Sequence, residues 1–293
     1  ASFGSLELRK SAEPQFIGQA IEATSKKSEE STTTAAAETT AAPATTAAAG
    51  ETTAAPSNLS ATLDASGSTF VKNFLEEGIS RFTAANSGVT VNYAGGGSGK
   101  GRQDLADQIV AFAGTDSTIK DEDLSKFKGG KVLYFPAVVA PITVSFNVSG
   151  VDKLSLSATT IAKIFQVQIT KWNDAAIAAE NPGVTLPDTD ITVVHRSDSS
   201  GTTGNFTKFL EKAVGADAGA VWALGTGSTV EWSADTQAAE GNGGVAQLIA
   251  ATDGAIGYVD FADAVKAGLK FASVQNKAGK FVEATLEGAS AAA

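Results

Sequence analysis

The chain has 293 residues, 43% of them hydrophobic and 18% charged, so it can form two packed lobes once its low-complexity part is set aside. Its formal net charge of −10 argues against a nucleic acid or an anionic membrane surface as a partner. It contains no cysteine, which excludes disulfides and thiolate zinc sites, and no methionine, which indicates a processed product or a fragment.

Residues 1–58 are expected to form a disordered tether rich in Ala, Thr and Pro. The segment Glu38-Thr39-Thr40-Ala41-Ala42-Pro43 recurs at 51–56. Such a composition buries too little apolar surface to offset the entropy lost on folding. Residues 1–30 contain no apolar run long enough for a signal peptide or a membrane span, so the sequence itself gives no export signal.

From Leu59 on, strand-like runs alternate with helical patterns. The strand-like runs include 132–139 and 191–194, and apolar residues recur at helical spacing in 70–85, 158–166 and 203–214. This alternation predicts an α/β fold with a largely parallel sheet, in which ligands sit beyond the carboxyl ends of the strands.

A long apolar run over residues 135–147 is predicted to be buried and extended, at the point where the chain crosses from one lobe to the next. We therefore expect a first lobe, lobe I, over residues 59–136 and a second, lobe II, over residues 137–293.

Three loops of glycine and hydroxyl residues precede expected helices. They are Ser66-Gly67-Ser68-Thr69, the glycine run 95–101 before an expected helix at 102–109, and 196–204, which opens with Arg196. A helix start offers unpaired N–H groups and the positive end of its dipole, and arginine adds a planar fork of donors. Each loop alone also fits an ordinary N-cap. Together they predict an anion site if the fold aims them at one point.

Nucleotide-binding and catalytic patterns fit poorly. The glycine run fails the phosphate-loop pattern because Lys100 is followed by Gly101, and it lacks the spacing of a dinucleotide fingerprint. His195 is the only histidine, and we expect a packed or edge residue there. Asp116 follows a short apolar run and fits either a helix cap or a ligand group. Asp198 either orients Arg196 or is a surface turn residue.

Several short motifs occur in the order seen in one family of transport proteins. They are 66–70, 91–93 with 97–99, 114–116, 161–174, 181–183, 196–202, 225–230 and 254–258. From about residue 60 to its end the chain resembles the periplasmic or lipoprotein phosphate-binding proteins of bacterial ABC phosphate importers.

The resemblance implies a two-lobed α/β fold of the type II periplasmic-binding-protein kind, which closes on one inorganic phosphate in the cleft between its lobes. It implies no enzymatic activity, no cofactor and no metal. Asp198 would brace Arg196 without contacting the anion. The implied phosphate ligands are Thr69, Phe70 (through its N–H), Ser98 and Asp116 from the first lobe, with Arg196, Ser200, Gly201 and Thr202 from the second.

The resemblance also implies an exported monomer, in the periplasm or on the outer face of the cytoplasmic membrane. It would meet the membrane only through an N-terminal anchor and would deliver phosphate to an ABC permease. Members of the family continue well past a point like Gly288, so lobe I is expected to be incomplete. Three alternatives stay open: a receptor for sulfate or molybdate, a phosphohydrolase that uses the same anion cradle, and a surface sensor or adhesin.

Overall fold

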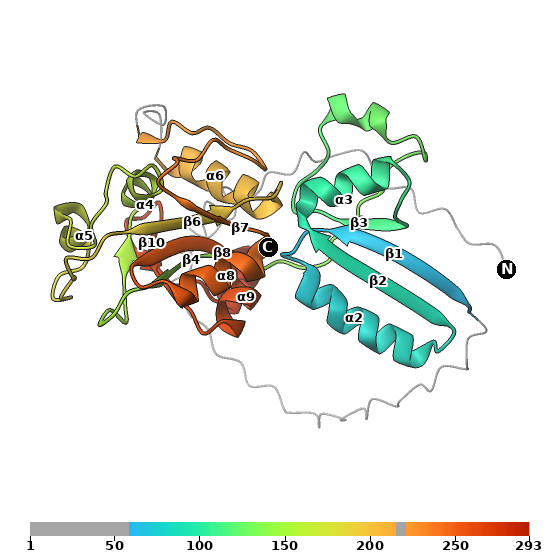
Figure 1. Ribbon diagram of the computed structural model, residues 1–293, viewed down its shortest axis with the longest axis horizontal. Helices are drawn as coiled ribbons and strands as arrows, with labels where there is room; N and C mark the ends of the chain where they lie inside the picture. Colours follow the sequence, from blue (N-terminus) through green and yellow to red (C-terminus); the bar gives the residue numbers. More distant parts are fainter. Residues whose placement is uncertain (1–58, 215–220, 293) are drawn as a thin grey trace, which may run out of the picture.

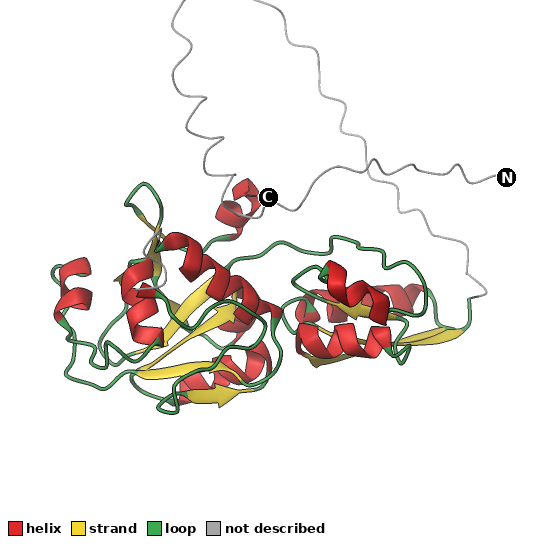
Figure 2. Cartoon of the chain, turned by 90° about the horizontal axis from the view of Figure 1, so that it is seen from above, coloured by secondary structure: helices red, strands yellow, loops and turns green. Residues whose placement is uncertain are grey.

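The computed structural model describes residues 59–214 and 221–292, so the predicted tether over residues 1–58 lies outside the described residues. The described part forms two lobes that lie side by side (Figure 1). Residues 127–141 contain neither helix nor strand and carry the chain from lobe I to lobe II (Figure 2). The boundary predicted at residue 136 lies inside this segment and stays a prediction.

Lobe I is built on a three-stranded parallel sheet with strand order β2-β1-β3. The connections from β1 to β2 and from β2 to β3 run in opposite directions across the sheet. Because such crossovers are right-handed, their helices cover opposite faces, as Figure 1 shows for α2 and α3. The elements of lobe I are β1 (Ala61–Gly67), α2 (Lys72–Ala85), β2 (Val89–Gly96), α3 (Gly97–Ala106), β3 (Phe112–Gly114) and the 3₁₀ helix η1 (Asp121–Lys126).

Lobe II is built on a five-stranded mixed sheet with strand order β7-β6-β8-β4-β9, in which β6, β7 and β8 run parallel. A small sheet of β11, β10 and β5 lies beside it. The strands of lobe II are β4 (Ile142–Asn147), β5 (Ser155–Leu156), β6 (Thr192–Arg196), β7 (Gln237–Ala239), β8 (Ala255–Asp260), β9 (Lys270–Phe271), β10 (Ser273–Gln275) and β11 (Phe281–Val282). Its helices are α4 (Ala158–Phe165), α5 (Ala175–Glu180), α6 (Gly201–Ala213), α8 (Gly241–Ala251), α9 (Phe261–Lys266) and α10 (Leu286–Ala292).

The larger sheet separates two hydrophobic clusters. On β8, Ile256 and Tyr258 point into the cluster that includes residues of α4 and α6, whereas Ala255 and Val259 point into the one that includes residues of α8 and α9. This is the two-residue period of a strand with both faces buried. The same alternation on β6 turns Arg196 toward the face opposite to that of its neighbour His195.

Two sequence predictions about residues 132–147 are wrong, and a third predicted element, a helix, exists with different bounds. Residues 132–139 form no strand, and the run expected to be buried is exposed up to residue 139, with Phe135 83% and Val139 62% exposed. Apolar, β-branched residues favour a strand only where a neighbouring strand can pair with them, and none does so here among the described residues. The helix expected at 102–109 begins at Gly97, inside the glycine run, because the preceding Gly96 adopts a φ of 110°.

Other predictions about regular structure are confirmed. Helix α4 coincides with the predicted 158–166, helix α6 covers the predicted 203–214 except its last residue, and β6 covers most of 191–194. The expected parallel sheet is found in lobe I, whereas β4 and β9 make the sheet of lobe II mixed.

Asp260, at the end of β8, has a buried carboxyl group that lies near the carboxyl group of Asp263. Its Oδ1 accepts hydrogen bonds from the backbone N–H groups of Ala262 and Asp263, at 3.0 and 3.1 Å, and so caps α9. Its Oδ2 has no hydrogen-bond partner among the described residues. Burial, and then the charge of Asp263, raises the pKa of Asp260 to about 8.

We expect Asp260→Asn to flatten the pH dependence of stability. The pKa of Asp260 is about 8 in the folded chain and about 3.9 in an unfolded one, so unfolding releases a proton between these values. This carboxyl therefore favours folding below pH ~4 and loses that contribution as the pH rises toward ~8. Asparagine keeps the capping oxygen without the charge, so the Tm of the variant should fall less than that of the parent between pH 5 and pH 8.

The exposed Asp235 supplies the control for this measurement, because Asp235→Asn should leave the pH dependence of Tm unchanged. A parent and an Asp260→Asn variant with the same slope of Tm against pH would contradict the raised pKa.

Candidate functional site

The wall contributed by lobe II is the start of helix α6. Ser200 is its N-cap, and the Ser200 Oγ accepts a hydrogen bond from the backbone N–H of Thr203 at 3.1 Å. The backbone N–H groups of Gly201 and Thr202 lie in the first turn, where a helix offers them no internal acceptor. This helix start therefore presents donors and a positive dipole end to whatever faces it.

A buried ion pair lies beside this helix start. The Arg196 side chain, at the end of β6, is 1% exposed and makes a two-pronged contact with Asp198: its Nε lies 2.7 Å from Oδ1, and its Nη2 contacts Oδ2. Asp198 also accepts the backbone N–H of Gly241 at 3.0 Å. Burial alone would raise the pKa of Asp198, but Arg196 and this N–H outweigh it and lower the pKa. The carboxylate therefore stays charged and fixes the guanidinium fork.

The wall contributed by lobe I centres on Asp116, which follows β3. Ser68 and Ser98 donate their hydroxyl groups to its two carboxylate oxygens, Ser98 at 3.3 Å. Burial raises the pKa of Asp116, and the two hydroxyls and the charge of Arg196 oppose this rise. The prediction that Asp116 could be a helix cap is wrong, because the next helix, η1, begins only at Asp121 and has no side-chain cap.

The two walls touch. The backbone N–H of Gly99 donates to the carbonyl of Ser199 at 2.9 Å, and the Asn205 amide donates to the carbonyl of Asp116 at 3.0 Å. A Cβ at Gly201 would lie 2.6 Å from Ser98 Oγ and 2.7 Å from Asp116 Oδ2. The lobes are therefore closed on one another, at a separation that only glycine allows at this position.

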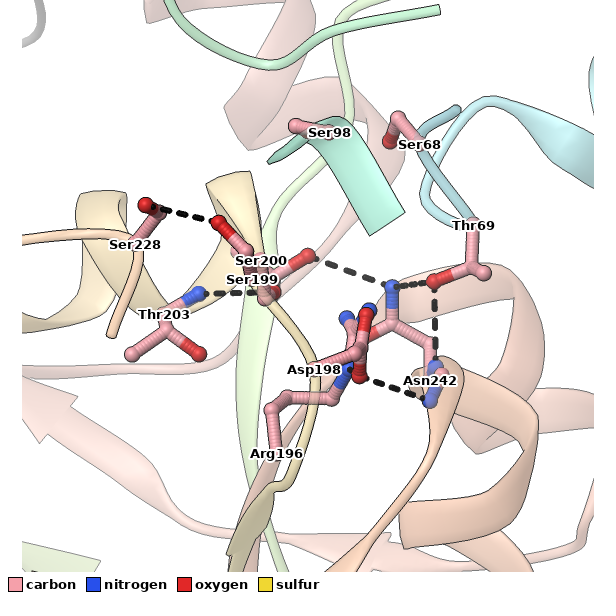
Figure 3. Close-up of polar contacts among 12 residues, drawn as sticks. Ser68, Thr69, Ser98, Arg196, Asp198, Ser199, Ser200, Thr203, Ser228 and Asn242 are labelled. Atoms are coloured by element: carbon pink, nitrogen blue, oxygen red, sulfur yellow. Dashed lines mark hydrogen bonds and ion pairs between the residues drawn. The ribbon is translucent and has the colours of Figure 1, made fainter. Parts of the chain in front are cut away.

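Thr69 and Phe70 complete the wall of lobe I. The N-cap of α2 is Val71, without a side-chain hydrogen bond, so the reading of 66–69 as an ordinary N-cap is wrong. The Thr69 Oγ1 instead faces lobe II and accepts hydrogen bonds from Asn242 (Figure 3). The backbone N–H of Phe70 donates to Ser68 Oγ at 3.1 Å.

All nine predicted residues thus lie on the two facing walls or directly behind them. Four further residues in contact with them were missed, and each acts through a partner far away in the sequence. The nearest sequence signal was that Ser68 belongs to the first hydroxyl loop and that Asn242 is followed by two glycines. These missed residues are Ser68, Asn205, Asn242 and Tyr258.

His195 takes no part in either wall. It is buried, as predicted for a packed residue, and its ring stacks on Trp232 with centroids 4.9 Å apart. Its Nδ1 lies 2.9 Å from the carbonyl oxygen of Arg196, and burial lowers its pKa. It lines a hollow of about 340 Å³ on lobe II together with Trp232 and several hydroxyl residues.

Residues 59–214 and 221–292 contain neither a candidate metal site nor a candidate membrane-spanning helix. No three His, Cys, Asp or Glu side chains there are grouped so that they could hold a metal ion. No helix in these residues has both the length and the apolar character needed to cross a bilayer.

Comparison with known proteins gives relatives that are named as phosphate-binding proteins. The chain is 34% identical over 238 residues to a phosphate-binding protein, PstS, of Xylella fastidiosa, covering 80% of this chain and 63% of that protein. It is 37% identical over 236 residues to a phosphate-binding protein, PstS, of Pasteurella multocida, covering 79% of this chain and 66% of that protein. The chain therefore spans less than two thirds of the length of these relatives.

Solved structures share the fold. A phosphate ABC transporter substrate-binding protein from Clostridium perfringens, with phosphate bound, superposes with a TM-score of 0.59 at 22% identity, over 78% of this chain and 79% of that one. A high-affinity periplasmic phosphate-binding protein with phosphate bound gives a TM-score of 0.59 at 25% identity, over 77% of this chain and 64% of that one.

A match over most of the chain shows its family. Residues 29–293 match the family model of the PBP superfamily domain. These residues include both lobes and every residue of the two walls. With its two-lobed α/β fold and facing walls, the chain belongs to the PBP superfamily.

Proposed function

We propose that this chain binds inorganic phosphate between its two lobes and delivers it to the permease of an ABC importer. The observation that carries the proposal is that hydrogen-bond donors on one wall face a hydrogen-bond acceptor on the other. Arg196 and the start of α6 supply donors from lobe II, and Asp116 faces them from lobe I. Near neutral pH phosphate keeps at least one proton, so it can accept from the donors and donate to the carboxylate at once.

Each residue of the walls has a role in this proposal. The hydroxyls of Thr69 and Ser98 and the N–H of Phe70 donate from lobe I, where Asp116 is the acceptor. To do so, Ser98 and Phe70 exchange their present bonds to Asp116 and Ser68 for bonds to the anion. Asp198 holds the guanidinium without contacting the anion. In the described residues the Arg196 Nη1 makes no hydrogen bond, so it can donate to phosphate. The donors from lobe II are Arg196, Ser200, Gly201 and Thr202.

The relatives support the choice of ligand. The proteins from Xylella fastidiosa and Pasteurella multocida are named as phosphate-binding proteins, and two structures of the same fold hold phosphate. Following them, we propose an exported receptor, in the periplasm or on the outer face of the cytoplasmic membrane, that works as a monomer. Its lobes are residues 59–136 and 137–293, and residues 1–58 serve as a tether.

We propose binding without catalysis. Hydrolysis of a phosphate ester needs an activated nucleophile or metal ions. The single histidine of the chain, His195, lies on the face of β6 opposite to Arg196 and hydrogen-bonds to a backbone carbonyl. It is therefore poorly placed to activate a nucleophile in the cleft. Incubation with a generic phosphate ester, with and without divalent metal ions, should release no phosphate.

Arg196→Ala should remove most phosphate binding. A hydrogen bond to a charged group contributes about 1.5–3 kcal/mol, so the loss of two such bonds weakens binding roughly a hundredfold or more. The variant also leaves Asp198 as an unpaired anion beside the ligand. Asp198→Asn should weaken binding less, because it acts only through Arg196. Titration calorimetry with phosphate measures both.

Arg81→Ala is the matched control, since Arg81 is an exposed lobe I arginine that pairs with Glu77 on the same helix. It should bind phosphate like the parent. An Arg196→Ala variant within a few-fold of the parent would overturn the assignment of this residue.

Gly97→Ala should weaken phosphate binding by keeping the lobes apart. Gly97 has a φ of 86°, and a Cβ there would overlap Asp198 Oδ2 across the closed cleft. Overpacking of this kind typically costs about 1–3 kcal/mol, so the affinity measured by calorimetry should fall about tenfold or more.

Gly150→Ala separates this effect from backbone strain. Gly150 has a similar φ of 77°, with nothing within 4 Å of the added Cβ. It should lower the Tm and leave phosphate affinity unchanged. Equal affinities for the two variants would contradict the role of Gly97 in closure.

Asp116→Asn should lower phosphate affinity and narrow the preference for phosphate over sulfate. Sulfate has no proton to donate, so the carboxylate of Asp116 repels it in a poorly solvated cleft. An amide can donate as well as accept and therefore removes this repulsion. Competition titrations at neutral pH measure the ratio of affinities, and an unchanged ratio would show that Asp116 does not select the anion.

A further inference from the structure

Asn242, in the first turn of α8, joins the two walls. It is fully buried and belongs to lobe II. Its side-chain Nδ2 donates to Thr69 Oγ1 of lobe I at 3.1 Å and to Thr202 Oγ1 of lobe II at 3.2 Å. Its backbone N–H also donates to Thr69 Oγ1 at 3.1 Å. Figure 3 shows the contacts between Asn242 and Thr69 as dashed lines.

These contacts fix the direction in which the Thr69 hydroxyl can act. A hydroxyl group has two acceptor lone pairs and one proton. The two N–H groups of Asn242 occupy both lone pairs of Thr69, so its proton must be donated elsewhere. In the described part of the chain, neither Thr69 nor Thr202 donates its hydroxyl proton to another residue.

The orientation of the Asn242 amide is itself fixed. The backbone N–H of Asp260 donates to the Oδ1 of Asn242 at 3.4 Å, and an amide nitrogen in that place could not accept this hydrogen bond. The Nδ2 must then face the two threonines with both of its protons. One amide therefore acts as a double donor to one hydroxyl from each lobe.

We infer that Asn242 is a positioning residue for the closed lobes: it leaves the Thr69 hydroxyl only the role of a donor toward the bound anion, and it turns the hydroxyl proton of Thr202 away from the amide. This inference rests on the proposed function, because phosphate is the ligand that accepts the hydrogen bonds of the two hydroxyls. The contact with Thr69 joins residues 173 positions apart and crosses from one lobe to the other, so it requires closure. Asn242 thereby couples closure to the donor set of the site.

A double-mutant cycle tests the inference. Asn242→Ala should weaken phosphate binding about tenfold in the parent. It removes the amide from both hydroxyls and leaves Thr69 with only the backbone N–H of residue 242, so both hydroxyls can rotate away from the anion. In a Thr69→Val/Thr202→Val background there are no hydroxyls to orient, so the same substitution should change the affinity by no more than about twofold. Titration calorimetry with inorganic phosphate measures all four proteins.

Asn181→Ala is the matched control for a purely structural asparagine. Asn181 is also buried, and its amide donates to the carbonyls of Ser155 and Ile177, away from the cleft. It should lower the Tm without changing phosphate affinity. If Asn242→Ala does not fold, Asn242→Ser takes its place in the cycle. Because the serine hydroxyl has one proton to donate, the loss of phosphate affinity should be smaller than the tenfold loss expected for Asn242→Ala.

The outcomes separate the two proposals. A parent that binds no phosphate overturns the proposed function and this inference with it. A parent that binds phosphate, with an equal loss from the Asn242 substitution in both backgrounds, overturns this inference alone and makes Asn242 a structural residue.

Discussion

The buried pair of Arg196 and Asp198 is the interaction on which the facing walls depend. A guanidinium with 1% of its surface exposed would be costly without a partner, and Asp198 supplies both charge and two-pronged geometry. The same carboxylate reaches the first residue of α8 through the N–H of Gly241 and lies against Gly97 of lobe I. One ion pair therefore ties together the end of β6, the start of α8 and the contact between the lobes.

The acceptor in the cleft is a carboxylate of lobe I, and it faces donors of lobe II. These groups lie where strands β3 and β6 end and helix α6 begins. Lobe II presents a strand end with an arginine and a helix start, both rich in donors. Lobe I presents Asp116, an acceptor whose two oxygens are already contacted by Ser68 and Ser98. A ligand that only accepts hydrogen bonds satisfies the donors of both lobes but is repelled by the carboxylate of Asp116. The site is thus suited to an anion that also carries a proton.

Local chemistry made part of this structure predictable. The loop 196–204 was identified from its hydroxyl and glycine residues and the helix after it, whereas the choice of Ser200 and Gly201 within it came from the family resemblance. Helix α4 was identified from apolar spacing within nine residues. The predictions failed where residues distant in the sequence determine the structure. Residues 132–139 have strand-forming side chains but no partner strand among the described residues, and Asn242 lies in the first turn of α8, whose local sequence gives no sign of a contact with Thr69. Its part in the site depends on a threonine 173 residues earlier, which no local pattern contains.

Closure and ligand chemistry are linked by short-range contacts. At Gly201 the start of α6 lies so close to Ser98 and Asp116 that a single added carbon would collide with them. Hydrogen bonds weaken steeply beyond about 3.5 Å, so the donors of lobe II and the acceptor of lobe I can serve one small anion only when the lobes meet. The contact between Asn242 and Thr69 obeys the same limit. The donor set is therefore a property of the closed molecule and of neither lobe alone. At Gly97 and Gly201 the same close approach leaves room for glycine and for no larger residue.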